Sequence, residues 1–250
     1  MADAALLIAV LARELEGSTH VAVGALSPIP GAAALVAREL SGGATRVSVL
    51  GSRRFNPFTD GGRELFDCAG QGRIDAFFLG GGEIDGAANV NLVGVGGYPQ
   101  SRHRFPGSFG SAFLYFAVPR VILFREAHSP RVLVPRVSFV SAPGTSPPGV
   151  WRRGGPRALV TGRCVFDFDR EAGRFALRSL HPGETLEGVI AATGFAFDIP
   201  ERVPETPPPS AAERALIAGA AGARIGETYP RFARAVLGIG VASGQGEGPQ

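Results

Sequence analysis

The chain has 250 residues, 45% hydrophobic and 19% charged, so it is long enough for one large domain or two small ones with a real core. All 25 basic residues are arginine, which excludes a lysine Schiff base, and a net charge of +3 with scattered arginines argues against nucleic-acid binding. The two cysteines lie outside any CxxC pair, which argues against structural zinc. The N-terminus has no basic stretch, which argues against a secretory signal, and no apolar run reaches about 18 residues, which argues against a membrane span. We therefore expect a cytoplasmic protein.

The first part of the chain alternates helical and strand patterns. Apolar residues at helical spacing predict a helix over 3–16, and a short strand over 21–23 leads into a glycine and proline turn. A second helix is predicted over 31–40 and a second strand over 47–50. This order of strand, turn, helix and strand, with short connections, is typical of a parallel sheet covered by helices, so we expect an α/β fold.

The remaining elements fall into one globular region and a C-terminal appendage. We expect an α/β domain over 3–200, a proline-rich connector with a C-terminal helix over 201–243, and a disordered tail over 244–250. Within these bounds the patterns predict helices over 62–70, 184–193 and 211–221, strands over 76–79, 118–124, 137–140 and 175–180, and a hairpin of 157–161 with 164–168.

Two glycine-rich loops are the most informative part of the sequence. The strand ending at Leu79 leads into three glycines, and a second loop of glycines and serines follows Pro106. Because glycine lets the main chain approach a ligand closely, we expect these loops to form a pocket for an extended, partly anionic ligand. The candidate ligand-contacting residues are Gly80, Gly81, Gly82, Asn89, Asn91, Gly107, Ser108, Phe109, Gly110, Ser111, Ser52 and Ser27.

Polar residues beside the first loop have two interpretations. Glu83 and Asp85 could carry out acid/base chemistry, but a structural role in the turn is equally natural for Asp85. Asn89 and Asn91 could donate amide N–H groups to a thioester carbonyl, as in an oxyanion hole. Alternatively, they could stabilise a tight turn through hydrogen bonds to the main chain. His103, between two arginines, could contact a phosphate or lie in a solvated loop.

Five motifs in order resemble the β subunit of class I CoA-transferases, and the glutaconate CoA-transferase type most closely. The resemblance spans about residues 5–200 and consists of the turn 24–28, the segment 79–91, the loop 104–111, the stretches 140–144 and 159–161, and the closing segment 181–195. It implies a CoA-transferase-like α/β fold with a central, mostly parallel sheet covered by helices. It also implies an α subunit of similar fold as partner, with the active site at their junction, in an αβ or α2β2 assembly.

One departure from that family concerns the chemistry. In the transferases a glutamate ends the second strand and carries the acyl group and then CoA, whereas the corresponding position here is Val49 or Leu50. An aliphatic side chain cannot form an anhydride or a thioester. Ser52 follows this position and could hydrogen-bond the substrate. The catalytic residues of this chain are therefore left unassigned, and we expect the partner to supply much of the acid/base chemistry.

The resemblance and the departure together predict a β subunit that acts on a keto- or carboxy-acyl-CoA. C–C hydrolysis or decarboxylation is the favoured reaction, because family members without the glutamate run such chemistry. Two alternatives stay open: a genuine acyl-CoA:carboxylate CoA-transferase subunit, and a non-catalytic subunit that binds ligand or serves as a scaffold. No metal or bound redox cofactor is implied, since CoA enters as part of the substrate.

Overall fold

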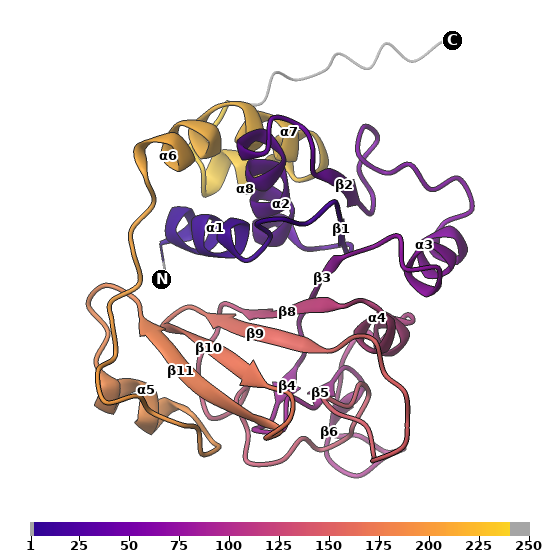
Figure 1. Cartoon of the computed structure of the whole chain (residues 1–250), viewed down its shortest axis with the longest axis vertical. Coiled ribbons are helices and arrows are strands. Elements are labelled where there is room, and N and C mark those ends of the chain that lie inside the picture. Colours follow the sequence, from indigo (N-terminus) through magenta and orange to yellow (C-terminus); the bar gives the residue numbers. More distant parts are fainter. Residues whose placement is uncertain (1–2, 241–250) are drawn as a thin grey trace.

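A seven-stranded sheet forms the centre of the molecule in the computed structural model, which describes residues 3–240 (Figure 1). Its strand order is β11-β10-β9-β8-β3-β1-β2. The five strands from β9 to β2 run parallel to one another. Strand β10 pairs antiparallel with β9, and β11 pairs antiparallel with β10. This confirms the predicted α/β class with a mostly parallel sheet. The strands are β1 His20–Val23, β2 Arg46–Val49, β3 Ala76–Leu79, β8 Arg120–Arg125, β9 Pro156–Thr161, β10 Cys164–Asp169 and β11 Arg174–Leu180.

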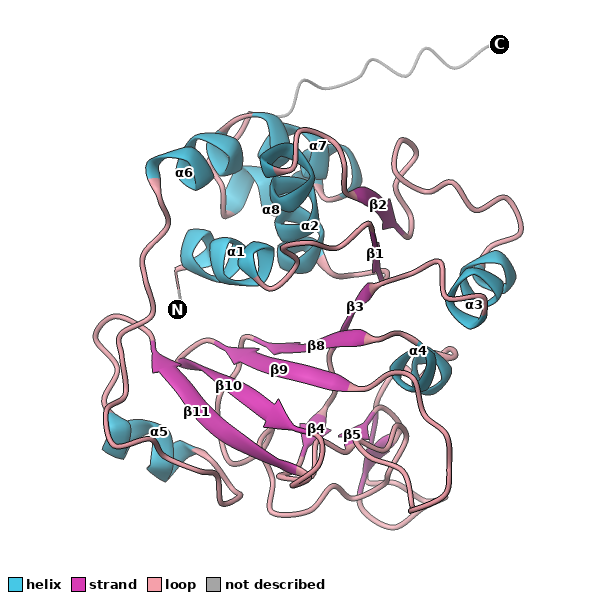
Figure 2. Cartoon of the chain, in the orientation of Figure 1, coloured by secondary structure: helices cyan, strands magenta, loops and turns pink. Residues whose placement is uncertain are grey.

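Helices cover both faces of this sheet (Figures 1 and 2). On one face α1 and α2 pack together, and the three C-terminal helices α6 to α8 pack on and around α2. The other face carries α3, α4 and α5. The helices are α1 Ala4–Arg13, α2 Pro28–Leu40, α3 Gly62–Gly70, α4 Ser111–Ala117, α5 Leu186–Ala192, α6 Ala211–Ala218, α7 Ala220–Thr228 and α8 Pro230–Ala235.

Alternation along the strands divides the core in two. Val21 and Val23 of β1 point into one hydrophobic cluster with α1 and α2, while Ala22 points into the other. In β3, Phe78 joins the first cluster and Phe77 the second. Successive side chains of a strand point to opposite faces, so a strand buried on both faces must be apolar throughout. These strands are therefore recognisable in the sequence as continuous apolar runs.

The segment between β3 and α4 forms two short antiparallel ladders. One pairs β4 (Glu83–Ile84) with β5 (Val90–Asn91), and the other pairs β6 (Gly94–Val95) with β7 (His103–Arg104). Both glycine-rich loops belong to this segment, and Figure 1 shows its strands β4, β5 and β6 below β8 and β9, near α4.

Two sequence expectations are wrong. Residues 137–140 form no strand, because Val137 N–H and Ser138 N–H donate to the carboxylates of Asp85 and Glu83 rather than to a neighbouring strand (3.3 and 2.7 Å). The C-terminal region has three helices instead of one. The helix expected at 31–40 begins earlier, at Pro28, whose fixed φ suits the first helical position. The expected tail at 244–250 lies outside the described residues.

Candidate functional site

A cavity of about 270 Å³ lies where the carboxyl ends of β1, β3 and β8 meet. The turn after β1 supplies Leu26 and Ser27, the end of β3 supplies Gly80, and the end of β8 supplies Arg125 and Glu126. Ligands of open parallel sheets bind at this edge, because the strand ends leave a crevice between the connecting loops. Of the first glycine loop, Gly80 lines this cavity.

The turn before α2 is held in an unusual conformation. Leu26 has φ of 57° and is 88% exposed, although a left-handed backbone is uncommon for a residue with a side chain of this size. Ser27 Oγ donates to the carbonyl of Ala25, and Ser27 N–H donates to the hydroxyl of Tyr229 (both 3.2 Å). The C-terminal helices therefore help to shape this wall of the cavity.

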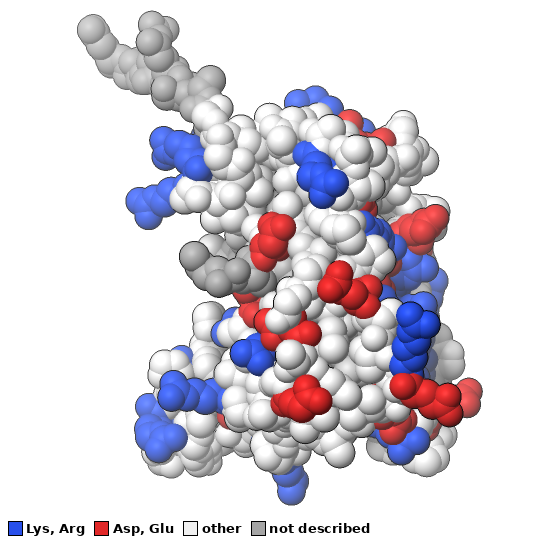
Figure 3. All heavy atoms as spheres, turned by 90° about the vertical axis from the view of Figure 1, so that its left-hand side faces the viewer, with Lys and Arg blue, Asp and Glu red and all other residues white. Residues whose placement is uncertain are grey.

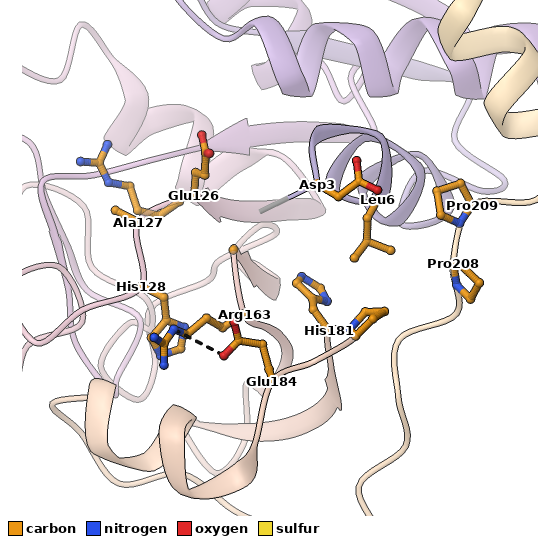
Figure 4. A pocket seen from close by; sticks show the side chains of 13 residues that line it. Asp3, Leu6, Glu126, Ala127, His128, Arg163, His181, Glu184, Pro208 and Pro209 are labelled. Carbon is orange, nitrogen blue, oxygen red and sulfur yellow. Dashed lines mark ion pairs between the residues drawn. The ribbon is translucent and has the colours of Figure 1, made fainter. Parts of the chain in front are cut away.

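A larger cavity of about 880 Å³ adjoins the first, since both are lined by Arg125 and Glu126 (Figure 4). Its other walls come from the N-terminal end of α1, the turn between β9 and β10, the start of the α5 segment and the connector to α6. Arg163 and Glu184 form an ion pair in one of its walls, at 3.6 Å (Figure 4). Figure 3 shows this side of the molecule, where acidic and basic side chains are mixed rather than gathered into a patch of one sign.

Histidines beside the larger cavity are neutral and fully hydrogen-bonded. His128 lies between the hydroxyls of Thr161 and Thr193, at 2.8 and 2.9 Å. Burial, aided by the charge of Arg163, lowers the pKa of His128 to about 4. His181 contacts the Thr206 hydroxyl and a main-chain carbonyl (both 2.9 Å), and burial lowers its pKa as well. These rings fix the cavity wall and carry no charge near neutral pH.

The three glycines of the first loop have different surroundings. Gly80 lines the smaller cavity. A Cβ at Gly81 would lie 2.4 Å from Val90 Cγ1, and one at Gly82 would lie 2.1 Å from the ring of Phe105. Gly81 and Gly82 therefore leave room for the side chains of Val90 and Phe105, and their predicted contact with a ligand stays a prediction.

The polar residues after this loop are used within the protein. Glu83 and Asp85 are buried, and Glu83 accepts hydrogen bonds from Asn91 Nδ2, Ser138 N–H and Ser138 Oγ at 2.7 to 3.0 Å. Asn91 is fully buried and also donates to Gly94 O at 2.8 Å, while its Oδ1 accepts from two main-chain N–H groups. These contacts favour the structural interpretation of Glu83 and Asn91.

Asp85 and Asn89 form a similar arrangement. Asp85 accepts from the main-chain N–H groups of Ala87 and Asn89 (both 3.1 Å) and from Asn89 Nδ2 (3.2 Å). Asn89 Oδ1 accepts from Gly144 N–H at 3.2 Å. The carboxylate thus closes a tight turn, as the alternative interpretation expects.

The second predicted loop lies at the N-terminal end of α4, away from both cavities. Gly107 N–H donates to Leu92 O at 3.0 Å, and Ser108 O accepts from Ser111 N–H at 2.8 Å. Phe109 is 75% exposed and Gly110 has a left-handed conformation. Residues 107–111 line neither cavity, so within this chain the structure does not bring them together with Gly80 and Ser27.

The carboxyl end of β2 carries no acidic side chain of its own. Val49 is buried and Leu50 is half-buried. Ser52 is buried, and its Oγ donates to the carboxylate of Glu227 at 2.9 Å, while Arg53 N–H donates to the same carboxylate at 3.0 Å. Helix α7 therefore places a carboxylate beside this strand end.

Sequence reasoning missed several of these residues. Arg125, Glu126 and His128 directly follow the predicted strand 118–124, and a charged run at the end of a buried parallel strand is a signal that could have identified them. Glu227 had no such signal, because its contact with Ser52 spans 175 positions.

No helix among residues 3–240 is long and apolar enough to cross a membrane. The same residues contain no group of three His, Cys, Asp or Glu side chains that could hold a metal ion.

The fold and the cleft define an α/β protein whose cavities lie at the carboxyl edge of a mostly parallel sheet. The chain belongs to the coenzyme A transferase family, whose model matches residues 4–192. It is 34% identical over 149 residues to the B subunit of 3-oxoadipate CoA-transferase from Pseudomonas knackmussii, an alignment that covers 57% of this chain and 56% of that protein.

Two further relatives are informative. The B subunit of glutaconate CoA-transferase from Acidaminococcus fermentans is 31% identical over 141 residues, or 53% of this chain and 52% of that protein. The chain thus spans a little over half the length of the curated relatives it matches. A solved structure of the decarboxylase AibA/AibB is similar with a TM-score of 0.72 and 26% identity, covering 95% of this chain and 99% of that chain. The predicted family resemblance is confirmed.

Proposed function

We propose that this chain is the β-type subunit of a heteromeric enzyme that decarboxylates or hydrolyses a C–C bond of a keto- or carboxy-acyl-CoA. Its similarity to two B subunits of CoA-transferases supports the subunit type and an α-type partner. Its similarity to the decarboxylase AibA/AibB supports chemistry other than CoA transfer.

The observation that carries this proposal is the end of β2. The family resemblance assigns the acyl-carrying glutamate of the transferases to Val49 or Leu50, and neither side chain can act as a nucleophile. The cavity at the ends of β1, β3 and β8, of which β1 is the neighbour of β2, nevertheless has the turn at Ser27 and the glycine at Gly80 in its lining. A binding site retained without its nucleophile favours a reaction that proceeds on the bound thioester itself.

The charged residues of the smaller cavity suit a carboxylated acyl chain. Arg125 is its cation, and a guanidinium pairs well with a carboxylate. On decarboxylation the bond to the carboxyl carbon breaks, CO2 leaves, and the electron pair passes into the thioester enolate, which then takes up a proton at carbon. Glu126, the acidic residue of this cavity, would take up a proton from solvent and pass it to that carbon, and we expect the partner to contribute the rest of the site.

A second candidate function has one specific observation in its favour. Glu227 brings a carboxylate to the end of β2, beside Ser52, although it comes from a helix near the end of the described chain. In a genuine CoA-transferase this carboxylate would attack the thioester carbonyl, forming an acyl-glutamyl anhydride and releasing the CoA thiolate. The thiolate would then attack the glutamyl carbonyl, forming a glutamyl thioester and releasing the acyl group as a carboxylate.

One experiment separates these functions. The chain is co-purified with an α-type partner and incubated with glutaconyl-CoA or 3-oxoadipyl-CoA, with and without acetate as a CoA acceptor. We expect CO2 or a C–C cleavage product without acetate, and no glutamyl hydroxamate by mass spectrometry after hydroxylamine treatment. A hydroxamate at Glu227 with acetyl-CoA formation would establish the transferase instead. If the partner alone has full activity, this chain is a non-catalytic scaffold subunit.

A further inference from the structure

A third cavity, of about 330 Å³, lies beside the outer edge of β2 and shares no residue with the two cavities of the cleft. Four of its seven lining residues are arginines and none is acidic. The lining consists of Arg38, Arg46, Val47, Arg54, Phe55, Pro57 and Arg224.

The fold draws these arginines from four separate segments. Arg38 comes from the last turns of α2, Arg46 begins β2, Arg54 lies in the loop after β2, and Arg224 lies on α7. Val49 N–H donates to the carbonyl of Phe55 at 2.8 Å, so the loop returns along the exposed edge of the sheet.

The loop is also fixed to the helix that carries Arg224. Glu227, one turn further along α7, accepts hydrogen bonds from Ser52 Oγ and Arg53 N–H. The position of Arg54 relative to Arg224 is therefore set by hydrogen bonds and not by a free loop.

Most of this positive charge lacks a carboxylate partner. Arg224 pairs with Glu39, but within residues 3–240 Arg38, Arg46 and Arg54 form no ion pair. The Arg38 guanidinium donates to a main-chain carbonyl at 3.3 Å, and that of Arg54 lies 5.6 Å from the centre of the Phe55 ring. Like charges gathered around one cavity repel each other, so an anion bound between them would be attracted by all of them.

We propose that this cavity binds the phosphate groups of a small anion. The guanidinium fork matches phosphate oxygens in pairs, and arginine is the residue best suited to such recognition. The apolar floor of Val47, Phe55 and Pro57 leaves a surface on which a planar base can lie beside the phosphates. Both free pyrophosphate and a nucleotide such as 3′,5′-ADP carry phosphate oxygens that could pair with these guanidinium groups. The cavity shares no residue with the two cavities of the cleft, so this inference does not depend on the reaction proposed there.

The test is a calorimetric titration of the full-length chain at low salt with pyrophosphate, 3′,5′-ADP and adenosine. The variant Arg46→Gln/Arg54→Gln removes two exposed arginines that form no ion pair, so its fold should be kept, which circular dichroism checks. The control Arg202→Gln/Arg214→Gln makes the same charge change at exposed positions of the connector and α6.

We expect both phosphate compounds to bind, adenosine not to bind, and the cavity variant to lose at least about tenfold in affinity while the control does not. Tighter binding of 3′,5′-ADP than of pyrophosphate would identify a nucleotide, and the reverse order a free phosphate compound. The proposal is overturned if neither phosphate compound binds at millimolar concentration, if adenosine binds equally well, or if both variants lose the same affinity.

Discussion

Arg125 and Glu126 are the two charged side chains that the cavities of the cleft have in common. Arg125 ends β8, a central strand of the sheet, and Glu126 follows it. Arg125 pairs with Thr161 of β9, and Glu126 O accepts a hydrogen bond from Gly162 N–H at 3.0 Å. Both side chains are exposed, in contrast to Glu83 and Asp85, which are buried in hydrogen bonds of the fold. Exposed charge on a rigid strand end is what a substrate carboxylate and a proton transfer require.

Replacement of Arg125 should change substrate binding more than turnover. In Arg125→Gln we expect the KM for glutaconyl-CoA to rise about tenfold or more, because a charge-assisted pair to the distal carboxylate is lost. The inhibition constant of an acyl-CoA without that carboxylate, which cannot be decarboxylated and serves as a competitive inhibitor, should stay unchanged. Steady-state kinetics of the assembled enzyme measure both, with Arg131→Gln, an exposed arginine of the next loop, as the control. An equal rise of the KM and of this inhibition constant would contradict the pairing.

His128 should make stability depend on pH. Its pKa is about 4 in the fold against an ordinary 6.5, so as pH falls the unfolded chain takes up the proton first. The neutral ring therefore stabilises the fold fully above pH 6.5, and this contribution is lost between pH 6.5 and 4. It amounts to about 2 kcal/mol between pH 7.5 and 5.

Urea unfolding of the native protein and His128→Gln at these two pH values provides the measurement. The native protein should lose about 2 kcal/mol more than the variant on acidification. His20 and His181, whose pKa values burial also lowers, are present in both proteins and cancel in the comparison. Equal losses would show that His128 does not stay neutral in the fold.

At the level of elements, an ion pair between Arg13 and Glu213 links α1 to α6. Glu213 is buried at the start of α6 and accepts two hydrogen bonds from the Arg13 guanidinium, at 2.7 and 2.8 Å. It also forms a capping box with Ser210. The hydrogen bond from Arg13 is the main cause that lowers the pKa of Glu213 to about 2.

We expect Glu213→Gln to lower the free energy of unfolding by about 2 kcal/mol at pH 7, because a charged partner of a buried ion pair is removed. The native protein should lose this advantage as pH falls from about 4.5 towards 2, while the variant should not. Urea unfolding at pH 7 and pH 3 tests both statements, with Glu201→Gln, an exposed residue of the connector, as the control. A variant as stable as the control would mean that the pair does not hold α6 to α1.

At the level of the whole molecule, local patterns predict the elements of the sheet well. Ala76–Leu79 forms a strand at the predicted bounds, because a strand buried on both faces needs a continuous apolar run. The same reasoning fails at Val137, whose apolar neighbours suggest a strand. Its N–H is bound instead by Asp85, a side chain 52 positions away. Propensity cannot foresee a partner so distant in sequence.

In the candidate site too, residues placed by a local pattern could be predicted, and residues placed by contacts distant in sequence could not. Ser27 and Gly80 could be assigned to the cleft, because a turn or glycine after a buried parallel strand lies at the binding edge. Asn91 could not be settled, since an asparagine that contacts a ligand and one that closes a turn look alike in sequence. The contact of Glu227 with Ser52 depends on how the C-terminal helices pack, which no local pattern encodes.

The proposed partner should cover an apolar surface around α4. Phe109 and Trp151 are 75% and 74% exposed, and each contacts an aromatic side chain of the α3 and α4 region: Phe109 lies 6.0 Å from Phe66, and Trp151 6.3 Å from Phe116 (ring centroids). Large aromatic residues rarely stay exposed together on a protein that acts alone, and they are enriched at the centres of interfaces.

The double variant Phe109→Ser/Trp151→Ser should therefore weaken association with the α-type partner by at least about 100-fold, since aromatic residues at interface centres each contribute about 2 kcal/mol or more. The melting temperature of the isolated chain should hardly change, because both side chains already contact water. Light scattering after co-expression and analytical ultracentrifugation measure the association, and Ile199→Ser, an exposed apolar residue of the connector, is the matched control. If the double variant assembles as well as the control, the partner binds elsewhere, and the second glycine loop before α4 has no place in a shared active site.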